Sequence, residues 1–175
     1  DEKNKRIYFT ANKRSVLESH LYSVRFDGTG LKLLTPEPGV HRVSMSPGGH
    51  SFIDRFSSLD QPPAIVYRKN DGTLIRILGE TDLSSIKIGD ISKPSIVRFL
   101  AEDKETVLNG IMTLPQDYIK GKKYPLLVYG YGMPGTQIVW NSWQAGFQQF
   151  LAKEGYIVFS MDSRGMSGRG RDFKN

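Results

Sequence analysis

A glycine-rich segment at residues 130–135 is the part of the sequence best suited to chemistry. It reads Gly-Tyr-Gly-Met-Pro-Gly and lies between an apolar run at 124–129 and a segment of helical periodicity at 142–154. Glycines let the backbone approach a ligand closely, so that N–H groups can stabilise a phosphate or a developing oxyanion. Two kinds of site fit this position: a dinucleotide-binding loop and the oxyanion hole of an α/β-hydrolase.

The dinucleotide interpretation rests on the G-x-G-x-x-G spacing and on Asp162, which follows the next apolar run. In such a site the helix begins within the glycine loop, because its N-terminal N–H groups must meet the pyrophosphate. Pro134 and Gly135 would interrupt that first turn, and the helical pattern begins only near Asn141. The hydrolase interpretation is therefore favoured, with Asp162 and Arg164 holding a turn.

The sequence contains no nucleophile elbow of the form G-x-S-x-G. Residues 165–169 come nearest, but Arg169 stands where the second glycine is needed, so Ser167 is interpreted as a loop residue. No metal site or cofactor is predicted, because the chain has no Cys and no histidine pair with metal-ligand spacing. Structural or surface roles are expected for the three histidines: His20, His41 and His50.

The elements that must position the glycine segment follow from periodicity. Residues 96–101 and 107–114 predict a hairpin. The short apolar runs at 124–129 and 156–161 suit strands buried on both faces. Between them, residues 142–154 predict an amphipathic helix, and strand, helix and strand together predict a right-handed βαβ unit.

The predicted helix has its own start and stop signals. Asn141 or Ser142 can cap its N-terminus, and Gly155 can end it. The aromatic stripe on one face of the helix is expected to be core: Trp143, Phe147, Phe150 and Leu151.

The first half of the chain carries an internal repeat. Asp-Gly-Thr at 27–29 recurs at 71–73, 44 residues later, and the apolar run at 31–34 recurs at 75–78. Strands are predicted at 6–10, 21–26, 31–34, 43–46, 52–57, 65–68 and 74–78. About four strands per repeat of about 40–50 residues is typical of a β-propeller blade. The alternative is a small antiparallel sheet with an accidental repeat.

Composition places the 175 residues among soluble globular proteins, with 38% hydrophobic and 24% charged residues. No apolar stretch approaches the length that spans a bilayer. The net charge of +6 is spread along the chain, which indicates a solvated surface and no nucleic-acid partner. Residues 1–5 are charged and do not resemble a signal peptide, which suggests a mature or excised segment.

These features together resemble the dipeptidyl peptidase IV branch of the prolyl oligopeptidase family. The most specific parts are the Tyr-Gly-x-Pro-Gly-Thr-Gln run at 131–137 and the Arg-Gly-x-x-Gly-Arg-Gly run at 164–170. The resemblance implies a mixed fold: a β-propeller blade segment of antiparallel strands at 1–90, followed by the N-terminal part of an α/β-hydrolase domain at 91–175.

The resemblance also implies a site and an activity. Tyr131 would donate its phenol O–H to the oxyanion, with loop support from Gly132, Pro134 and Gly135. Met133 stands where close relatives often carry Gly. The parent would be a serine exopeptidase that releases N-terminal Xaa-Pro or Xaa-Ala dipeptides, and this chain would be an inactive internal fragment without the catalytic Ser, Asp and His.

Further expectations concern partners and location. The parent would bind a peptide substrate and form a homodimer, and the fragment's open strand edges would invite association. An exported bacterial protein, periplasmic or on the cell surface, is expected from the family. The alternative function is a non-catalytic binding module built from a propeller and a hydrolase-like scaffold.

Overall fold

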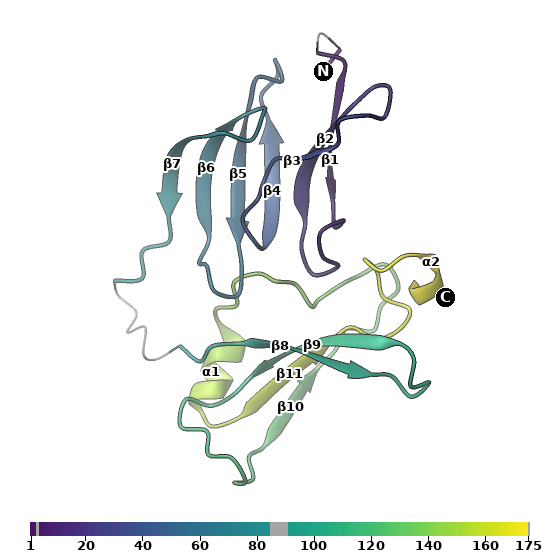
Figure 1. The fold of residues 1–175 in the computed structure, drawn as a ribbon. Helices are drawn as coiled ribbons and strands as arrows, with labels where there is room; N and C mark the ends of the chain where they lie inside the picture. Colours follow the sequence, from purple (N-terminus) through teal and green to yellow (C-terminus); the bar gives the residue numbers. More distant parts are fainter. Residues whose placement is uncertain (3, 85–90, 175) are drawn as a thin grey trace. The chain divides into compact units, whose positions relative to one another are not determined.

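The structure is a computed structural model that describes residues 1–2, 4–84 and 91–174 (Figure 1). These residues form two compact units. The first comprises Asp1–Thr81 together with Asn141–Trp143, and the second comprises the remaining described residues. The predicted boundary between residues 1–90 and 91–175 falls at the end of the segment 85–90, which lies outside the described residues.

The first unit contains two antiparallel sheets. One is three-stranded, in the order β1-β2-β3, and the other is a four-stranded meander, in the order β4-β5-β6-β7 (Figure 1). The strands are β1 (Arg6–Ala11), β2 (His20–Arg25), β3 (Lys32–Leu33), β4 (Val40–Met45), β5 (Ser51–Ser57), β6 (Ala64–Lys69) and β7 (Leu74–Glu80). A four-stranded antiparallel meander is the form of a propeller blade, as the repeat predicts.

The repeated Asp-Gly-Thr segments form the same turn in both sheets. The N–H of Thr29 donates to Asp27 Oδ1 at 2.9 Å, and the N–H of Thr73 donates to Asp71 Oδ1 at 2.8 Å. Gly28 and Gly72 have φ of 82° and 94°, a region that favours glycine. The repeat therefore encodes one β-hairpin twice, joining β2 to β3 and β6 to β7.

In β1 and β5, strand pairing places the equivalent residues of the two repeats one position further apart than the offset of 44 predicts. Ser23 pairs with Tyr8 in the first sheet, and Tyr67 pairs with Ile53 in the second. Tyr8 thus corresponds to Ile53, not to Phe52 as a constant offset of 44 would require. The hairpin between β5 and β6 absorbs the difference.

Apolar side chains from both sheets form the core of the first unit. Leu21, Leu34 and Phe52 are each at most 3% exposed and pack together, with Tyr8, Val43 and Met45 against them. Gly72 is required at this contact, because a Cβ there would lie 2.7 Å from the carbonyl oxygen of Leu34. The two sheets therefore pack face to face through this cluster.

Two buried histidines extend that core with hydrogen bonds to carbonyl and carboxylate groups. The ring nitrogens of His20 lie 2.8 Å from the Thr35 carbonyl and 3.0 Å from Glu18 Oε2. His41 Nδ1 lies 2.9 Å from Asp54 Oδ2, and the two imidazole rings are 4.9 Å apart. His50 is exposed. The predicted structural or surface roles of the histidines are confirmed.

The second unit holds a four-stranded sheet in the order β10-β11-β9-β8. Its elements are β8 (Ser95–Leu100), β9 (Val107–Thr113), β10 (Leu126–Tyr129), α1 (Phe147–Lys153), β11 (Ile157–Met161) and α2 (Arg171–Lys174). The hairpin of β8 and β9 is antiparallel, and β10 and β11 are parallel, with α1 between them in sequence and packed on β11. The predicted hairpin and βαβ unit are confirmed.

Burial in this unit is lower than predicted. Leu126 and Val128 are 59% and 58% exposed, so β10 is not buried on both faces in this chain. The helix α1 packs on β11 and β9, and β10 lies at the edge of the sheet, paired only with β11 among the described residues. Phe147 and Phe150 are likewise exposed, and Ala152 is the buried residue of α1. Trp143 and Leu151 are partly buried. The expectation that the aromatic stripe is core was therefore wrong for Phe147 and Phe150.

The helix also begins later than predicted. Its N-cap is Gly146, with φ of 103° and no side-chain capping bond, instead of Asn141 or Ser142. Asn141 belongs to the first unit, where its N–H donates to the Leu17 carbonyl and its Oδ1 accepts from the Leu59 N–H. These contacts hold the segment outside the helix. Gly155, with φ of 86°, follows the helix as predicted.

Among the described residues, no helix is long and apolar enough to cross a membrane.

Candidate functional site

Tyr131 lies on the loop that leaves the carboxyl end of β10. The loop joins the third strand of the second unit, in chain order, to its first helix. The Tyr131 side chain is 54% exposed, and its hydroxyl has no hydrogen-bond partner among the described residues. A phenol that is exposed and lacks a partner can donate a hydrogen bond to an incoming oxygen.

Proline and glycine shape the loop after Tyr131. The N–H of Thr136 donates to the Met133 carbonyl at 3.3 Å, which closes a four-residue turn. Pro134 at the second position and Gly135 at the third, with φ of 86°, match the requirements of a type II turn. Gly132 has φ of 63°, so it too occupies the region that favours glycine. The three support residues predicted from the sequence all lie in this loop.

Asp162 holds the C-terminal end of the same loop by accepting hydrogen bonds from its backbone. Its carboxylate is 4% exposed and accepts the N–H of Ile138 at 2.8 Å and of Val139 at 3.2 Å. Burial raises the pKa of Asp162, and the two N–H groups and the charge of Arg169 offset that effect only in part. Asp162 is therefore a structural acceptor, which agrees with the expected role in holding a turn.

The expectation that Arg164 shares this role with Asp162 was wrong. Its guanidinium instead donates to Asp103 at 3.1 Å, between partly exposed groups. The positive charge that interacts with Asp162 is that of Arg169. The Arg169 guanidinium donates to the Val107 carbonyl and stacks 4.0 Å above the Phe173 ring.

A second glycine-rich loop supports the first. The N–H of Ser167 donates to the Thr136 carbonyl at 2.8 Å, so Ser167 is a loop residue, as predicted. Gly168 has φ of 90° and lies directly against the Gln137 side chain, where a Cβ would overlap the amide oxygen. Gly168 thus allows the close approach of two loops.

The geometry does not fit a dinucleotide site. No helix begins in the glycine segment, since residues 133–136 form a turn and α1 begins only at Phe147. The Asp162 carboxylate is occupied by loop N–H groups instead of being open to a ribose. Among the described residues, no group of three or more His, Asp or Glu side chains could hold a metal ion.

The structural role of Asp162 was predicted, but its partners were not. The only sequence signal was an acid placed directly after a buried strand, which also fits a ribose-binding acid. Its actual function depends on the backbone of residues 138–139, which the sequence does not place beside it.

Replacing Asp162 with Ala should loosen the candidate oxyanion loop. Two N–H groups would lose their acceptor, one of them on Val139, whose side chain is fully buried. Each buried unsatisfied group costs about 1–3 kcal/mol. We expect the amides of Ile138 and Val139 to exchange at least tenfold faster with deuterium.

The matched control is Glu102→Ala, which removes an exposed carboxylate from the same unit. It should leave exchange at 138 and 139 unchanged. Unaltered exchange in Asp162→Ala would show that the carboxylate does not hold the loop.

Comparison with known proteins gives one family and one fold. A model of the N-terminal region of dipeptidyl peptidase IV matches residues 1–63. A probable dipeptidyl-aminopeptidase B of Arthroderma benhamiae is 32% identical over 99% of this chain and 20% of its own length. A probable dipeptidyl peptidase 4 of Neosartorya fischeri is 30% identical over 99% of this chain and 24% of its own length.

The fold is similar to a solved peptidase structure. The crystal structure of Porphyromonas gingivalis dipeptidyl peptidase 4 aligns with 98% of this chain and 24% of its own, at a TM-score of 0.85 and 19% identity. This likeness shows the fold alone. The chain spans about a fifth to a quarter of the length of the relatives it matches.

The organisms of the curated relatives contradict the predicted bacterial location. These two curated relatives are fungal, and so is a probable dipeptidyl-aminopeptidase B of Botryotinia fuckeliana at 33% identity, which contradicts the expectation of a bacterial periplasmic or cell-surface protein. The family expectation, by contrast, is confirmed. The family model at residues 1–63 and relatives aligned with 99% of this chain agree, and the chain belongs to the dipeptidyl peptidase IV family.

Proposed function

We propose that this chain is part of a serine exopeptidase that releases Xaa-Pro or Xaa-Ala dipeptides from the N-terminus of peptides. The observation that carries the proposal is the position of Tyr131, exposed on the loop between the third strand and the first helix of the second unit. This is the loop from which α/β-hydrolases recruit an oxyanion-hole donor. The names of the relatives support the substrate class.

The proposal assigns a domain to each half of the chain. Residues 1–90 would be the end of a β-propeller, supported by the four-stranded meander and the repeated turn. Residues 91–175 would be the start of an α/β-hydrolase domain, supported by the parallel β10-α1-β11 crossover beside an antiparallel hairpin. The family model covers only the first of these regions.

In the proposed reaction a serine outside this chain attacks the carbonyl of the second residue of the substrate. A histidine, also outside this chain, takes the serine hydroxyl proton and later gives it to the leaving amine. The carbonyl oxygen gains negative charge, and the Tyr131 hydroxyl donates a hydrogen bond to it, beside a backbone N–H. Collapse of the intermediate expels the amine of the third residue and leaves an acyl-enzyme, which water hydrolyses to the free dipeptide. Asp162 contributes by keeping the Tyr131 loop in place.

The test is the activity of the full-length protein on Gly-Pro-p-nitroanilide. We expect release of nitroaniline from this substrate and none from its N-acetylated form, because an exopeptidase of this kind requires a free amino terminus. The isolated 175-residue chain should be inert on both. Turnover of the acetylated substrate at a similar rate would contradict the exopeptidase assignment.

The same assay separates the alternative, a non-catalytic binding module. A full-length protein that folds, binds peptide and releases no nitroaniline would favour that module over the peptidase. Labelling of a single serine by a fluorophosphonate would favour the peptidase.

A further inference from the structure

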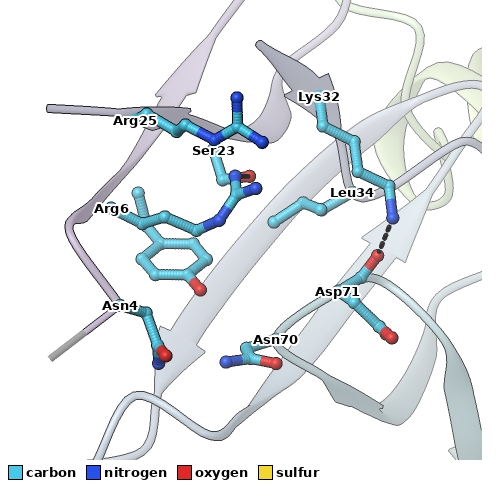
Figure 2. A pocket seen from close by; sticks show the side chains of 9 residues that line it. Asn4, Arg6, Ser23, Arg25, Lys32, Leu34, Asn70 and Asp71 are labelled. Carbon is cyan, nitrogen blue, oxygen red and sulfur yellow. Dashed lines mark hydrogen bonds between the residues drawn. The ribbon is translucent and has the colours of Figure 1, made fainter. Parts of the chain in front are cut away.

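The first unit contains a polar pocket of about 420 Å³, remote in sequence from the Tyr131 loop. Its walls come from the three-stranded sheet and from the turn that joins β6 to β7. The lining residues are Asn4, Arg6, Tyr8, Ser23, Arg25, Lys32, Leu34, Asn70 and Asp71. Figure 2 shows the side chains of Arg6, Arg25 and Lys32 projecting into it, with Asn4 and Asn70 along one edge.

Three cations in this pocket have neutral partners. Arg6 donates to the Ser23 hydroxyl at 3.1 Å, Arg25 to the Thr29 hydroxyl at 3.3 Å, and Lys32 to the Asp71 carbonyl at 2.7 Å. Among the described residues none of the three forms an ion pair with a carboxylate. A guanidinium has five N–H donors, so both arginines keep donors for a ligand.

The pocket contains a single acid, and its carboxylate is already engaged. Asp71 Oδ1 accepts the N–H of Thr73 at 2.8 Å. That bond lowers the pKa of Asp71, and the charges of Lys32 and Lys69 lower it further. Among the lining residues three cations outnumber one carboxylate, so the local charge is positive, although Arg25 also interacts with the charge of Asp27, which lies outside the lining.

The Arg6 guanidinium is held in position from inside the fold. Its partner Ser23 is 2% exposed and lies on β2, beside β1. Leu34, which is 1% exposed, belongs to the apolar core, so the base of the pocket is rigid. A preorganised guanidinium loses less entropy when it binds an anion than a mobile one.

We propose that this pocket binds the phosphate or sulfate group of a small monoester. Two guanidinium groups and an ammonium supply the charged donors that a tetrahedral oxyanion accepts. The Asn70 amide supplies a neutral donor for a hydroxyl group, and the Asn4 amide, which already donates to Asp1 Oδ2 at 2.8 Å, keeps a second N–H. The volume lies in the range of small-molecule sites and exceeds what a free ion fills, which favours an ester over the ion itself.

The test is calorimetric titration of the full chain with glucose 6-phosphate, inorganic phosphate and glucose at about 0.15 M salt, where diffuse attraction is screened. We expect saturable binding of the ester, weaker binding of free phosphate and none of glucose. Arg6→Gln and Arg25→Gln should each weaken ester binding at least tenfold, as loss of a charge-assisted hydrogen bond does.

The matched control is Arg42→Gln, an exposed arginine on β4 that does not line the pocket. It removes the same net charge and should leave the affinity unchanged. An equal loss in Arg42→Gln, or no saturable binding, would overturn the site. Free phosphate binding as tightly as the ester would overturn its assignment to an ester. Because Arg25 is exposed, its variant reports on binding even if Arg6→Gln unfolds.

Discussion

Full-length protein carrying Tyr131→Phe should lose about 10²–10³-fold in kcat on Gly-Pro-p-nitroanilide, with little change in KM. The substitution removes one hydroxyl, which we propose stabilises charge that exists only in the transition state. Loss of such an interaction lowers kcat and kcat/KM together. Stability should not change, because the side chain is 54% exposed and its hydroxyl has no partner among the described residues.

Tyr129→Phe is the matched control for this experiment. Tyr129 ends β10, is 48% exposed and is two residues from Tyr131, so the variant removes the same group from the same neighbourhood. Its kcat should stay within about twofold of the unmodified protein. Equal losses in the two variants would indicate a general effect of the loop, and an active Tyr131→Phe protein would remove Tyr131 from the oxyanion hole.

Asp54→Ala should produce the largest loss of stability in the first unit, about 3–5 kcal/mol. Asp54 is fully buried and lies against His41 Nδ1 at 2.9 Å and Arg68 Nε at 3.4 Å. Its removal takes the fully buried counter-charge away from a guanidinium that is 3% exposed, which then keeps only the partly exposed Glu37, at 2.6 Å, among the described residues. Thermal unfolding of the full chain, followed by circular dichroism, should show a midpoint about 10 °C lower.

Two further variants serve as controls for that result: Asp54→Asn and Glu80→Ala. The amide keeps the shape of Asp54 but not its charge, so it should restore only part of the stability. Glu80 is an exposed carboxylate at the end of β7, and its loss should shift the midpoint by no more than about 2 °C. A midpoint unchanged in Asp54→Ala would mean that the ion pairs do not stabilise this unit.

The same network should make stability depend on pH at the acid end. Burial alone would raise the pKa of Glu37, but the hydrogen bond from Arg68 and its charge outweigh burial and lower it. A folded-state pKa below that of the unfolded chain stabilises the protein at neutral pH, and that contribution is lost as pH falls through the folded value. The pKa of Glu18 is also lowered. Burial alone would raise it, but the hydrogen bonds with His20 and Asn141 outweigh burial.

Much of the first unit was predictable because its signals are local. An Asp-Gly-Thr turn is determined by the side chain of Asp, the φ of Gly and the N–H of Thr, all within three residues. Strand alternation and the repeat period then predicted the blade. The one-residue shift between β1 and β5 was not predicted, because register is set by pairing across strands and not by the sequence of either strand.

The helix start was mispredicted for a related reason. Asn141 has the right chemistry for an N-cap, but its amide bonds to Glu18 at 2.8 Å and to the N–H of Leu59. Both partners are distant in sequence. Capping propensity is a weak preference, and these tertiary hydrogen bonds outweigh it.

By itself, the sequence determined the blade turns, the order of hairpin, strand, helix and strand, and the family to which these belong. Only the tertiary structure decided what Asp162 binds, which aromatic residues of α1 are exposed, and that Arg6, Arg25 and Lys32 share one pocket. Periodicity and turn chemistry act over a few neighbouring residues, so one sequence reports them. A buried clamp or a convergent set of cations depends on which distant backbone segments meet, and that follows only from the packed fold.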